Sequence, residues 1–227
     1  MESKESELLR LHIEAVWGVL LPPLVHNECE LLPTSNRPIW RLYVADIAAA
    51  RIYIWHPDVV GGEREALRSR ASAVLASPPA SASLVGVKRE VALAFTASPA
   101  LELNAAHGIA RPLSVQDQAL IERFESGSSS YMLHPAKRPL IGVVDSSGLL
   151  CIAHSSRRTD VACELGIETL PSARRKGYAL AATILWTHAV LQEGLVPIYS
   201  TFAENTPSLN LAAEAGYRAF VHGATVV

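Results

Sequence analysis

The sequence is short of cysteine and has no excess of charge of either sign, and both features exclude classes of protein. Cys29, Cys151 and Cys163 are odd in number and lack Cys-x-x-Cys spacing, so they encode neither a disulfide framework nor a zinc site. We therefore expect no bound metal and a reducing environment. The formal net charge of -2 gives no reason to expect nucleic acid as a partner, so any basic site must be local.

Long hydrophobic runs and the common nucleotide-binding motifs are also missing. The apolar stretch 16–21 is too short to cross a bilayer, and the basic start of a signal peptide is absent, so we expect no membrane contact and a cytoplasmic protein. Gly-x-x-x-x-Gly-Lys-Ser/Thr, Gly-x-Gly-x-x-Gly and Gly-x-Ser-x-Gly do not occur, which argues against a Walker-type site, a Rossmann site and a serine-hydrolase elbow.

The composition is that of a globular protein, with 49% hydrophobic and 19% charged residues. A chain of 227 residues can form one large domain or two small ones, and we favour two. In the first part the periodicity and the Pro and Gly residues predict helices over 6–20 and 63–75, strands over 38–45 and 51–55, a linker over 77–83 and one or two strands over 85–96. A second loose stretch, 98–108, is the predicted boundary between the two parts.

The second part has clearer boundaries between its elements. Ser114 and Asp117 resemble a capping box at the start of a helix, and Gly194 and Gly216 follow two later helices. The predicted order is a helix to 125, a hairpin over 140–153, a strand over 161–170, a helix over 178–192, a strand over 196–202, a helix over 206–215 and a strand from 217.

A basic turn stands between the strand 161–170 and the helix 178–192. Arg174, Arg175 and Lys176 directly precede Gly177, where the helix begins. A helix start offers unpaired N–H groups and the positive end of the helix dipole, and glycine lets an anion approach the backbone. The turn therefore predicts a seat for a phosphate group.

The pattern Arg174-x-x-Gly177-x-Ala179 resembles the coenzyme A signature of the GCN5-related N-acetyltransferases (GNAT), Gln/Arg-x-x-Gly-x-Gly/Ala. ELGIETL and VPIYST stand where the fourth and fifth strands of that family are expected, and ENTPSLNLAAEAGYR is similar to its Asn-x-x-Ser...Gly-Phe/Tyr ending. ARPLSVQDQALIERF is similar to its opening strand and helix. The resemblance covers about residues 109–225.

The resemblance implies an α+β fold whose central mixed sheet, flanked by helices, splays between its fourth and fifth strands. Acetyl-CoA would enter there as co-substrate, with its pyrophosphate on the amides of the basic turn and its pantetheine paired with the fourth strand as an extra strand would be. The residues that the resemblance assigns to the coenzyme are Ile167, Thr169, Arg174, Arg175, Lys176, Gly177, Tyr178, Ala179, Asn205 and Ser208.

Acetyl transfer to an amine needs a neutral nitrogen, so we expect a base that removes a proton from the ammonium ion, directly or through water. With the strand period of two, Glu164, Gly166 and Glu168 share one face, and Cys163 belongs to the opposite, core-facing one. Glu164 lies near the position where several family members carry a catalytic glutamate, whereas Glu168 would lie closer to the thioester. Both glutamates are candidates for the catalytic base.

The sequence departs from the family at one position. Many members carry a tyrosine one helical turn after the serine of the last helix, but after Ser208 that place is taken by Ala212. Tyr199, Ser200 or a water molecule is then left to protonate the thiolate, or the thiolate leaves unaided. This departure weakens the prediction of catalysis more than that of binding, so a non-catalytic acyl-CoA-binding regulatory module remains the alternative.

Plainer interpretations also remain open. The basic turn could be a solvated helix start, Glu164 and Glu168 could be solvent-facing acids, and Asn205 could only cap the last helix. The histidines have no partner at metal-ligand spacing, so surface or core positions are favoured for His134, His154 and His188. Binding of a polyanion by the basic turn is a third function, disfavoured by the near-neutral charge.

The prediction is an acyl-CoA-dependent N-acyltransferase that passes acetyl directly to a primary amine in a ternary complex. Its partners would be acetyl-CoA and the amine acceptor, without nucleic acid or membrane, and a homodimer is compatible with the sequence. Residues 1–105 would form an α+β accessory domain, which could be a degenerate copy of the same fold, and residues 106–227 the GNAT domain. No motif encodes the acceptor or the acyl-chain length.

Overall fold

The computed structural model describes residues 3–32, 37–48, 50–78 and 84–227. The chain folds into two compact units, and neither is one continuous stretch. The first unit contains residues 1–94, 200–209 and 219–227, and the second contains residues 95–199 and 210–218. The division of the chain into domains 1–105 and 106–227 stays a prediction. In the first unit, two C-terminal segments pack together with the N-terminal segment.

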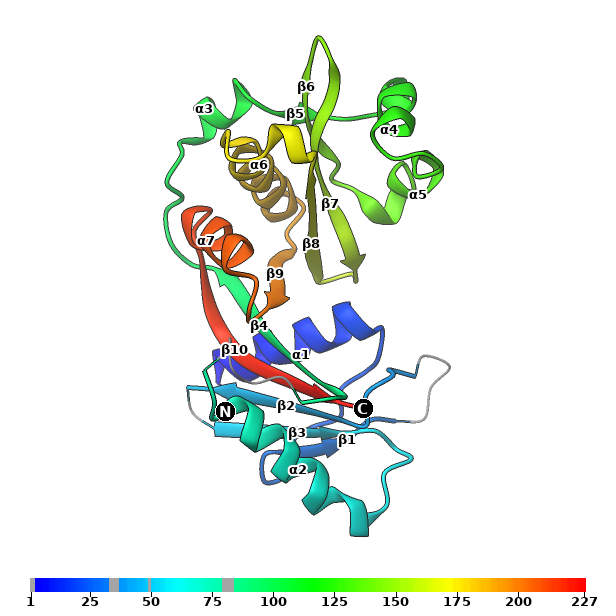
Figure 1. Ribbon diagram of the computed structural model, residues 1–227, viewed down its shortest axis with the longest axis vertical. Helices are drawn as coiled ribbons and strands as arrows, with labels where there is room; N and C mark the ends of the chain where they lie inside the picture. The colour runs from blue at the N-terminus through cyan, green and yellow to red at the C-terminus, as the bar shows by residue number, and fades with distance from the viewer. Residues whose placement is uncertain (1–2, 33–36, 49, 79–83) are drawn as a thin grey trace. The chain divides into compact units, whose positions relative to one another are not determined.

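The first unit is a sheet with a helix on each face. Its elements are α1 (Lys4–Trp17), β1 (Glu28–Glu30), β2 (Leu42–Ile47), β3 (Ala50–Trp55), α2 (Gly61–Leu75), β4 (Val87–Phe95) and most of β10 (Tyr217–Val226). The strands follow the order β1-β3-β2-β10-β4, with β10 antiparallel to β2. Figure 1 shows α1 and α2 on opposite sides of β2 and β3.

Alternation along β2 explains why both faces of this sheet are covered. Tyr43 and Ala45 belong to the core under α1, whereas Leu42 and Val44 belong to the core under α2. Successive side chains of a strand point to opposite faces, so a strand with apolar residues on both faces needs a partner on each face. The burial of β2 on both sides therefore requires both helices of the unit.

The second unit holds the rest of the chain's regular structure. Its first elements are α3 (Leu103–His107), β5 (Arg111–Pro112), α4 (Gln118–Phe124), α5 (Ser129–Met132), β6 (Ile141–Asp145) and β7 (Gly148–Arg158). Then come β8 (Ala162–Thr169), α6 (Tyr178–Gln192), most of β9 (Val196–Phe202) and the C-terminal part of α7 (Thr206–Glu214). The strands follow the order β5-β6-β7-β8-β9, and the pair β8–β9 is parallel while the others are antiparallel.

The β8–β9 ladder is short. Ala162, Cys163 and Glu164 pair with Val196, Pro197 and Ile198. The remaining residues of β8, 165–169, are all described and have no register partner on β9. The two strands therefore part beyond Glu164, which confirms the predicted mixed sheet that splays between these strands.

Most of the predicted elements are confirmed. The helix 178–192 and the strand 196–202 have the expected bounds, and the hairpin turns at Asp145–Gly148. Ser114 and Asp117 do form a capping box, although it opens a 3-10 turn that leads into α4. The region 85–96 is the single strand β4, and the predicted linker 77–83 lies mostly outside the described residues.

Two other expectations concern single features. The segment 98–108, expected to be loose, contains the short helix α3. Cys163 is fully buried, as expected for a core residue, and burial raises the pKa of its thiol above the ordinary value. In the described part of the chain, no helix is both long enough and apolar enough to cross a membrane.

Replacing Gly216 with alanine should destabilise the protein more than the same change at Gly127. Both glycines have positive φ, 93° and 80°, where an L residue costs about 1 kcal/mol. A Cβ on Gly127 would meet nothing within 4 Å, but one on Gly216 would overlap the Ala97 carbonyl oxygen and lie 2.8 Å from Phe95 Cε2.

We expect urea unfolding to show a loss of about 1 kcal/mol for Gly127→Ala and about 2–4 kcal/mol for Gly216→Ala. Equal losses would mean that the backbone at Gly216 relaxes away from the contact with Ala97.

Candidate active site

The basic turn has the geometry of an anion seat. Arg175 and Gly177 have positive φ, 61° and 80°, and α6 begins directly after Gly177. No side chain caps this end of the 15-residue helix, and a Cβ on Gly177 would meet nothing within 4 Å. Arg174, Arg175 and Lys176 are exposed. The amides of the first turn and the neighbouring cations are therefore open to an incoming phosphate.

One face of β8 carries the predicted acids. Glu164, Gly166 and Glu168 lie opposite Arg157, His154 and Ile152 of β7 in the antiparallel register. The Glu164 carboxylate accepts a hydrogen bond from the Ser156 hydroxyl at 3.0 Å and is largely buried. Glu168, at the other end of this face, lines an open cavity. The two glutamates, both candidates for the catalytic base in the sequence analysis, therefore have different surroundings in the structure.

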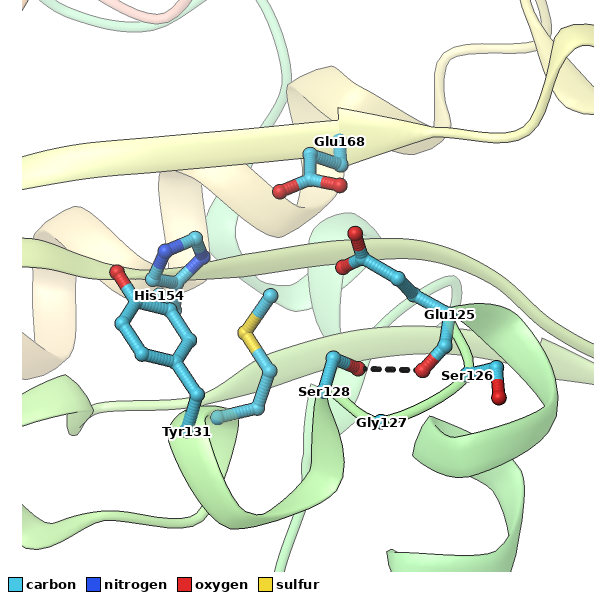
Figure 2. Close-up of a pocket in the computed structure, with 8 residues that line it drawn as sticks. Glu125, Ser126, Gly127, Ser128, Tyr131, His154 and Glu168 are labelled. Atoms are coloured by element: carbon cyan, nitrogen blue, oxygen red, sulfur yellow. Dashed lines mark hydrogen bonds between the residues drawn. The ribbon is translucent and has the colours of Figure 1, made fainter.

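The cavity belongs entirely to the second unit and has a volume of about 360 Å³. Figure 2 shows its lining, in which the carboxylates of Glu125 and Glu168 are turned toward each other and His154 lies beside Tyr131. The lining residues come from the loop after α4, from α5, from β7 and from β8: Glu125, Ser126, Gly127, Ser128, Tyr131, Met132, His154 and Glu168.

The protonation states of the cavity follow from its surroundings. Partial burial and the nearby charge of Glu125 raise the pKa of Glu168 above its ordinary value. Burial, together with the charges of Lys137 and Arg157, lowers the pKa of His154 to about 4. The carboxyl group of Glu168 therefore binds a proton more strongly than a free glutamate does, and the His154 imidazole is uncharged at neutral pH.

The described residues contain no group of three or more His, Cys, Asp or Glu side chains arranged to hold a metal ion. The three cysteines are free and buried.

Comparison with known proteins gives the family of this region. Residues 141–222 match the family model described as GNAT acetyltransferase. This stretch contains the splayed strands, the basic turn and Glu168. The chain has the fold of the GNAT acetyltransferases. No curated protein matches it.

Two solved structures support the GNAT fold. A GNAT-family protein from Novosphingobium aromaticivorans is 20% identical with a TM-score of 0.50, and the match covers 66% of this chain and 68% of that one. A GNAT-family acetyltransferase from Colwellia psychrerythraea is 17% identical with a TM-score of 0.51, covering 61% of this chain but only 55% of its own. At such identities the likeness concerns the fold.

The expected coenzyme residues fall into two groups. The described β8 and α6 bring together Ile167, Thr169 and the turn 174–179 in the second unit. Asn205 and Ser208 belong to the first unit, where the Asn205 side-chain oxygen accepts a hydrogen bond from the Ser208 backbone N–H at 3.3 Å. This is a capping contact at the start of α7, the plainer of the two roles expected for Asn205.

Of the two side chains expected as general acids, Tyr199 is buried and Ser200 is half-buried. Ala212, at the place of the missing tyrosine, is fully buried. Tyr199 is 2% exposed and packs edge to face on Tyr217, with ring centroids 5.6 Å apart. The Tyr217 hydroxyl is itself engaged with Thr187 at 2.5 Å. These tyrosines therefore have the packing of core residues of the GNAT sheet.

Sequence reasoning identified only Glu168 among the residues that line the cavity. Glu125, Tyr131 and His154 were not among the expected site residues, and His154 was expected to be a surface or core histidine. His154 does lie in the interior, but it forms part of the cavity lining. The one available signal was Gly166 in the middle of a strand, because such a glycine often marks a close approach.

Substitution of Gly177 by glutamate should abolish binding of acetyl-CoA. The new carboxylate would stand at the proposed phosphate seat and repel the pyrophosphate, so we expect the dissociation constant to rise at least about 100-fold. Isothermal titration calorimetry with acetyl-CoA measures this change.

Gly194→Glu is the matched control for Gly177→Glu. Gly194 follows the other end of α6, has φ 75° and likewise has nothing within 4 Å of an added Cβ. Both variants should lose similar stability, about 1 kcal/mol, but only Gly177→Glu should lose coenzyme binding. Equal binding by the two variants would exclude the turn as the phosphate seat.

Proposed function

We propose that this protein is an acyl-CoA-dependent N-acyltransferase, most simply an acetyltransferase, that passes acetyl from acetyl-CoA directly to a primary amine. The single observation that carries the proposal is the junction of β8 with α6. There an uncapped helix start behind Gly177 follows a strand whose last residues have no partner on β9, among residues that are all described. That junction offers a phosphate seat next to a free strand edge, which is what a phosphopantetheine chain needs.

In this proposal the coenzyme binds through backbone groups. Amides of residues 175–179 receive the pyrophosphate, with Arg174 and Lys176 as side-chain partners. Main-chain groups near Ile167 and Thr169 pair with the pantetheine, and one amide of β8 polarises the thioester carbonyl. Asn205 and Ser208 keep the proposed role of coenzyme contacts.

Glu168 is the proposed base. It lines the cavity and its pKa is raised, whereas Glu164 is held by Ser156 and is absent from the lining of the cavity, all of whose residues are described. Glu168 accepts a proton from the acceptor ammonium, directly or through water. Because a base works best when its pKa lies near the operating pH, the raised pKa suits this role. Glu164 then helps to fix β7 against β8 through Ser156.

The proposed acetyl transfer needs no general acid besides the acceptor nitrogen, because both protons lost by the ammonium group are accounted for. The lone pair of the neutral amine attacks the thioester carbonyl carbon and forms the C–N bond, and the C–S bond breaks as the tetrahedral intermediate collapses. The coenzyme thiolate leaves with the electron pair and takes up the second nitrogen proton, directly or through water. The products are the N-acetyl amine and free coenzyme A, and Glu168 returns its proton to the solvent.

A second candidate is a regulatory module that binds acyl-CoA without turnover, and the buried Ala212 favours it because the family's usual general acid is missing. A spectrophotometric assay of thiol release from acetyl-CoA, run with a broad panel of amines, separates the two candidates. Amine-dependent release supports the enzyme, whereas saturable binding without release for every amine supports the module.

The pH dependence tests the role of Glu168. Because its pKa is raised in the folded protein, the carboxylate needed as base forms only above that raised pKa, so kcat should fall on the acidic side at a higher pH than an ordinary glutamate would give. Removing the charge of Glu125 lowers the pKa of Glu168, so in Glu125→Gln this acidic limb should move to lower pH. In Glu168→Gln we expect kcat to drop about 100-fold or more, with the limb lost.

Glu214→Gln is the control for these pH profiles, since Glu214 is exposed on α7 and takes no part in the cavity. A profile that is unchanged in Glu168→Gln would remove Glu168 from the mechanism.

A further inference from the structure

His154 occupies an unusual position on β7. Its side chain is 4% exposed, it lines the cavity, and its Nδ1 atom is buried without a hydrogen-bond partner among the described residues. A buried polar atom without a partner is costly, so such atoms are rare unless a ligand or a water molecule pairs with them. His154 therefore has an unmet hydrogen-bonding atom on a ring that lines the cavity.

Gly166 holds the imidazole in this place. The two residues face each other across the β7–β8 ladder, and a Cβ on Gly166 would overlap the His154 ring, 2.7 Å from Nε2. Tyr131 supports the ring from the side, edge to face with centroids 6.1 Å apart. A glycine inside a strand weakens the strand, so its presence here is explained by the space that the histidine needs.

The cavity has two electrostatically different ends. Glu125 and Glu168 face each other at one end, and the charge of Glu125 raises the pKa of Glu168, so a cation between them relieves the repulsion. Near His154 the charges are positive, from Lys137 and Arg157. The Lys137 ammonium group lies 4.2 Å from the centre of the Tyr131 ring and donates to the Ser156 carbonyl at 2.7 Å, which fixes that charge beside the histidine.

We infer that the cavity binds a small molecule with a single primary ammonium group between Glu125 and Glu168, and that His154 hydrogen-bonds a second polar group of the same molecule that carries no positive charge. The positive surroundings of His154 disfavour a diamine with a charge at each end. The volume of about 360 Å³ suits a small molecule. That this molecule is the acetyl acceptor rests on the proposed function, whereas its binding does not.

Direct binding in the absence of acetyl-CoA tests the inference. The probes are propylammonium, ethanolammonium and 1-propanol, which have similar size and differ in charge or in one hydroxyl group, and 1,3-diaminopropane in its doubly charged form. Wild-type protein should bind ethanolammonium most tightly in calorimetry, propylammonium and the diamine more weakly, and 1-propanol not at all.

Four variants separate the two ends of the cavity, and a fifth serves as control. Glu125→Gln should weaken both ammonium probes about tenfold or more, because a charged partner is removed. His154→Phe should reduce ethanolammonium to the affinity of propylammonium and leave propylammonium unchanged, while His154→Gln should restore part of the difference. Gly166→Ala should act like His154→Phe, since the methyl group displaces the ring. Glu214→Gln should bind as the wild type does.

Circular dichroism and thermal unfolding of each variant show whether it is folded. Binding of propylammonium that is retained by the His154 variants shows that their lower affinity for ethanolammonium does not come from a damaged cavity. Absence of saturable ammonium binding by the wild type, equal binding by Glu125→Gln, or 1-propanol binding as well as propylammonium would overturn the inference. Acetyl transfer that persists in such a case would leave the proposed function standing. The expected binding pattern without any turnover would uphold the cavity and refute the transferase.

Discussion

β8 and β9 run parallel and are joined by the register pairs Ala162–Val196, Cys163–Pro197 and Glu164–Ile198. Beyond these pairs the last residues of β8 keep their pairing with β7 but leave their other edge open, within a stretch that the structure describes completely. An open edge of a sheet is a row of unpaired donors and acceptors, which a folded protein normally covers. In the GNAT fold this open edge is where the coenzyme belongs, and the phosphate seat, Glu168 and the cavity are all placed by the end of the same strand.

The charges of the protein are arranged locally. The formal net charge is -2, yet three exposed basic residues precede Gly177 and two carboxylates face each other in the cavity. A basic turn and an acidic cavity in one unit can attract ligands of opposite charge without a strong field around the whole molecule. The composition alone conceals this arrangement, because the two signs cancel in the sum.

The sequence was most informative where local chemistry determines structure. The Ala- and Leu-rich helix before Gly194, the hairpin at Asp145–Gly148 and the capping box at Ser114 follow from propensity and turn residues, and each was predicted close to its observed bounds. The alternation along β8 also placed Glu164 and Glu168 on one face correctly. The division between these glutamates was not predictable, because it depends on the hydroxyl of Ser156 and on the loop that carries Glu125.

His154 shows why the other residues of the cavity could not be predicted from the sequence. Nothing in its neighbouring residues marks it, and its position depends on a glycine in another strand, on a tyrosine in a loop and on charges brought close by the tertiary fold. The interleaving of the two units was equally hidden. Local patterns place a boundary where composition changes, but they do not reveal that residues 200–209 and 219–227 return to the first unit.

This return has a consequence for how the chain is made. In the first unit β10 pairs with β2 and lies next to β4 in the sheet, yet β10 is synthesised long after both of these strands. Until then β2 and β4 lack the neighbour that separates them in the finished sheet. Pairing between segments so distant in sequence forms slowly, and exposed strand edges meanwhile favour aggregation. A nascent chain that stalls before residue 217 would therefore carry an incomplete first unit, in which the edges of β2 and β4 that β10 covers stay open.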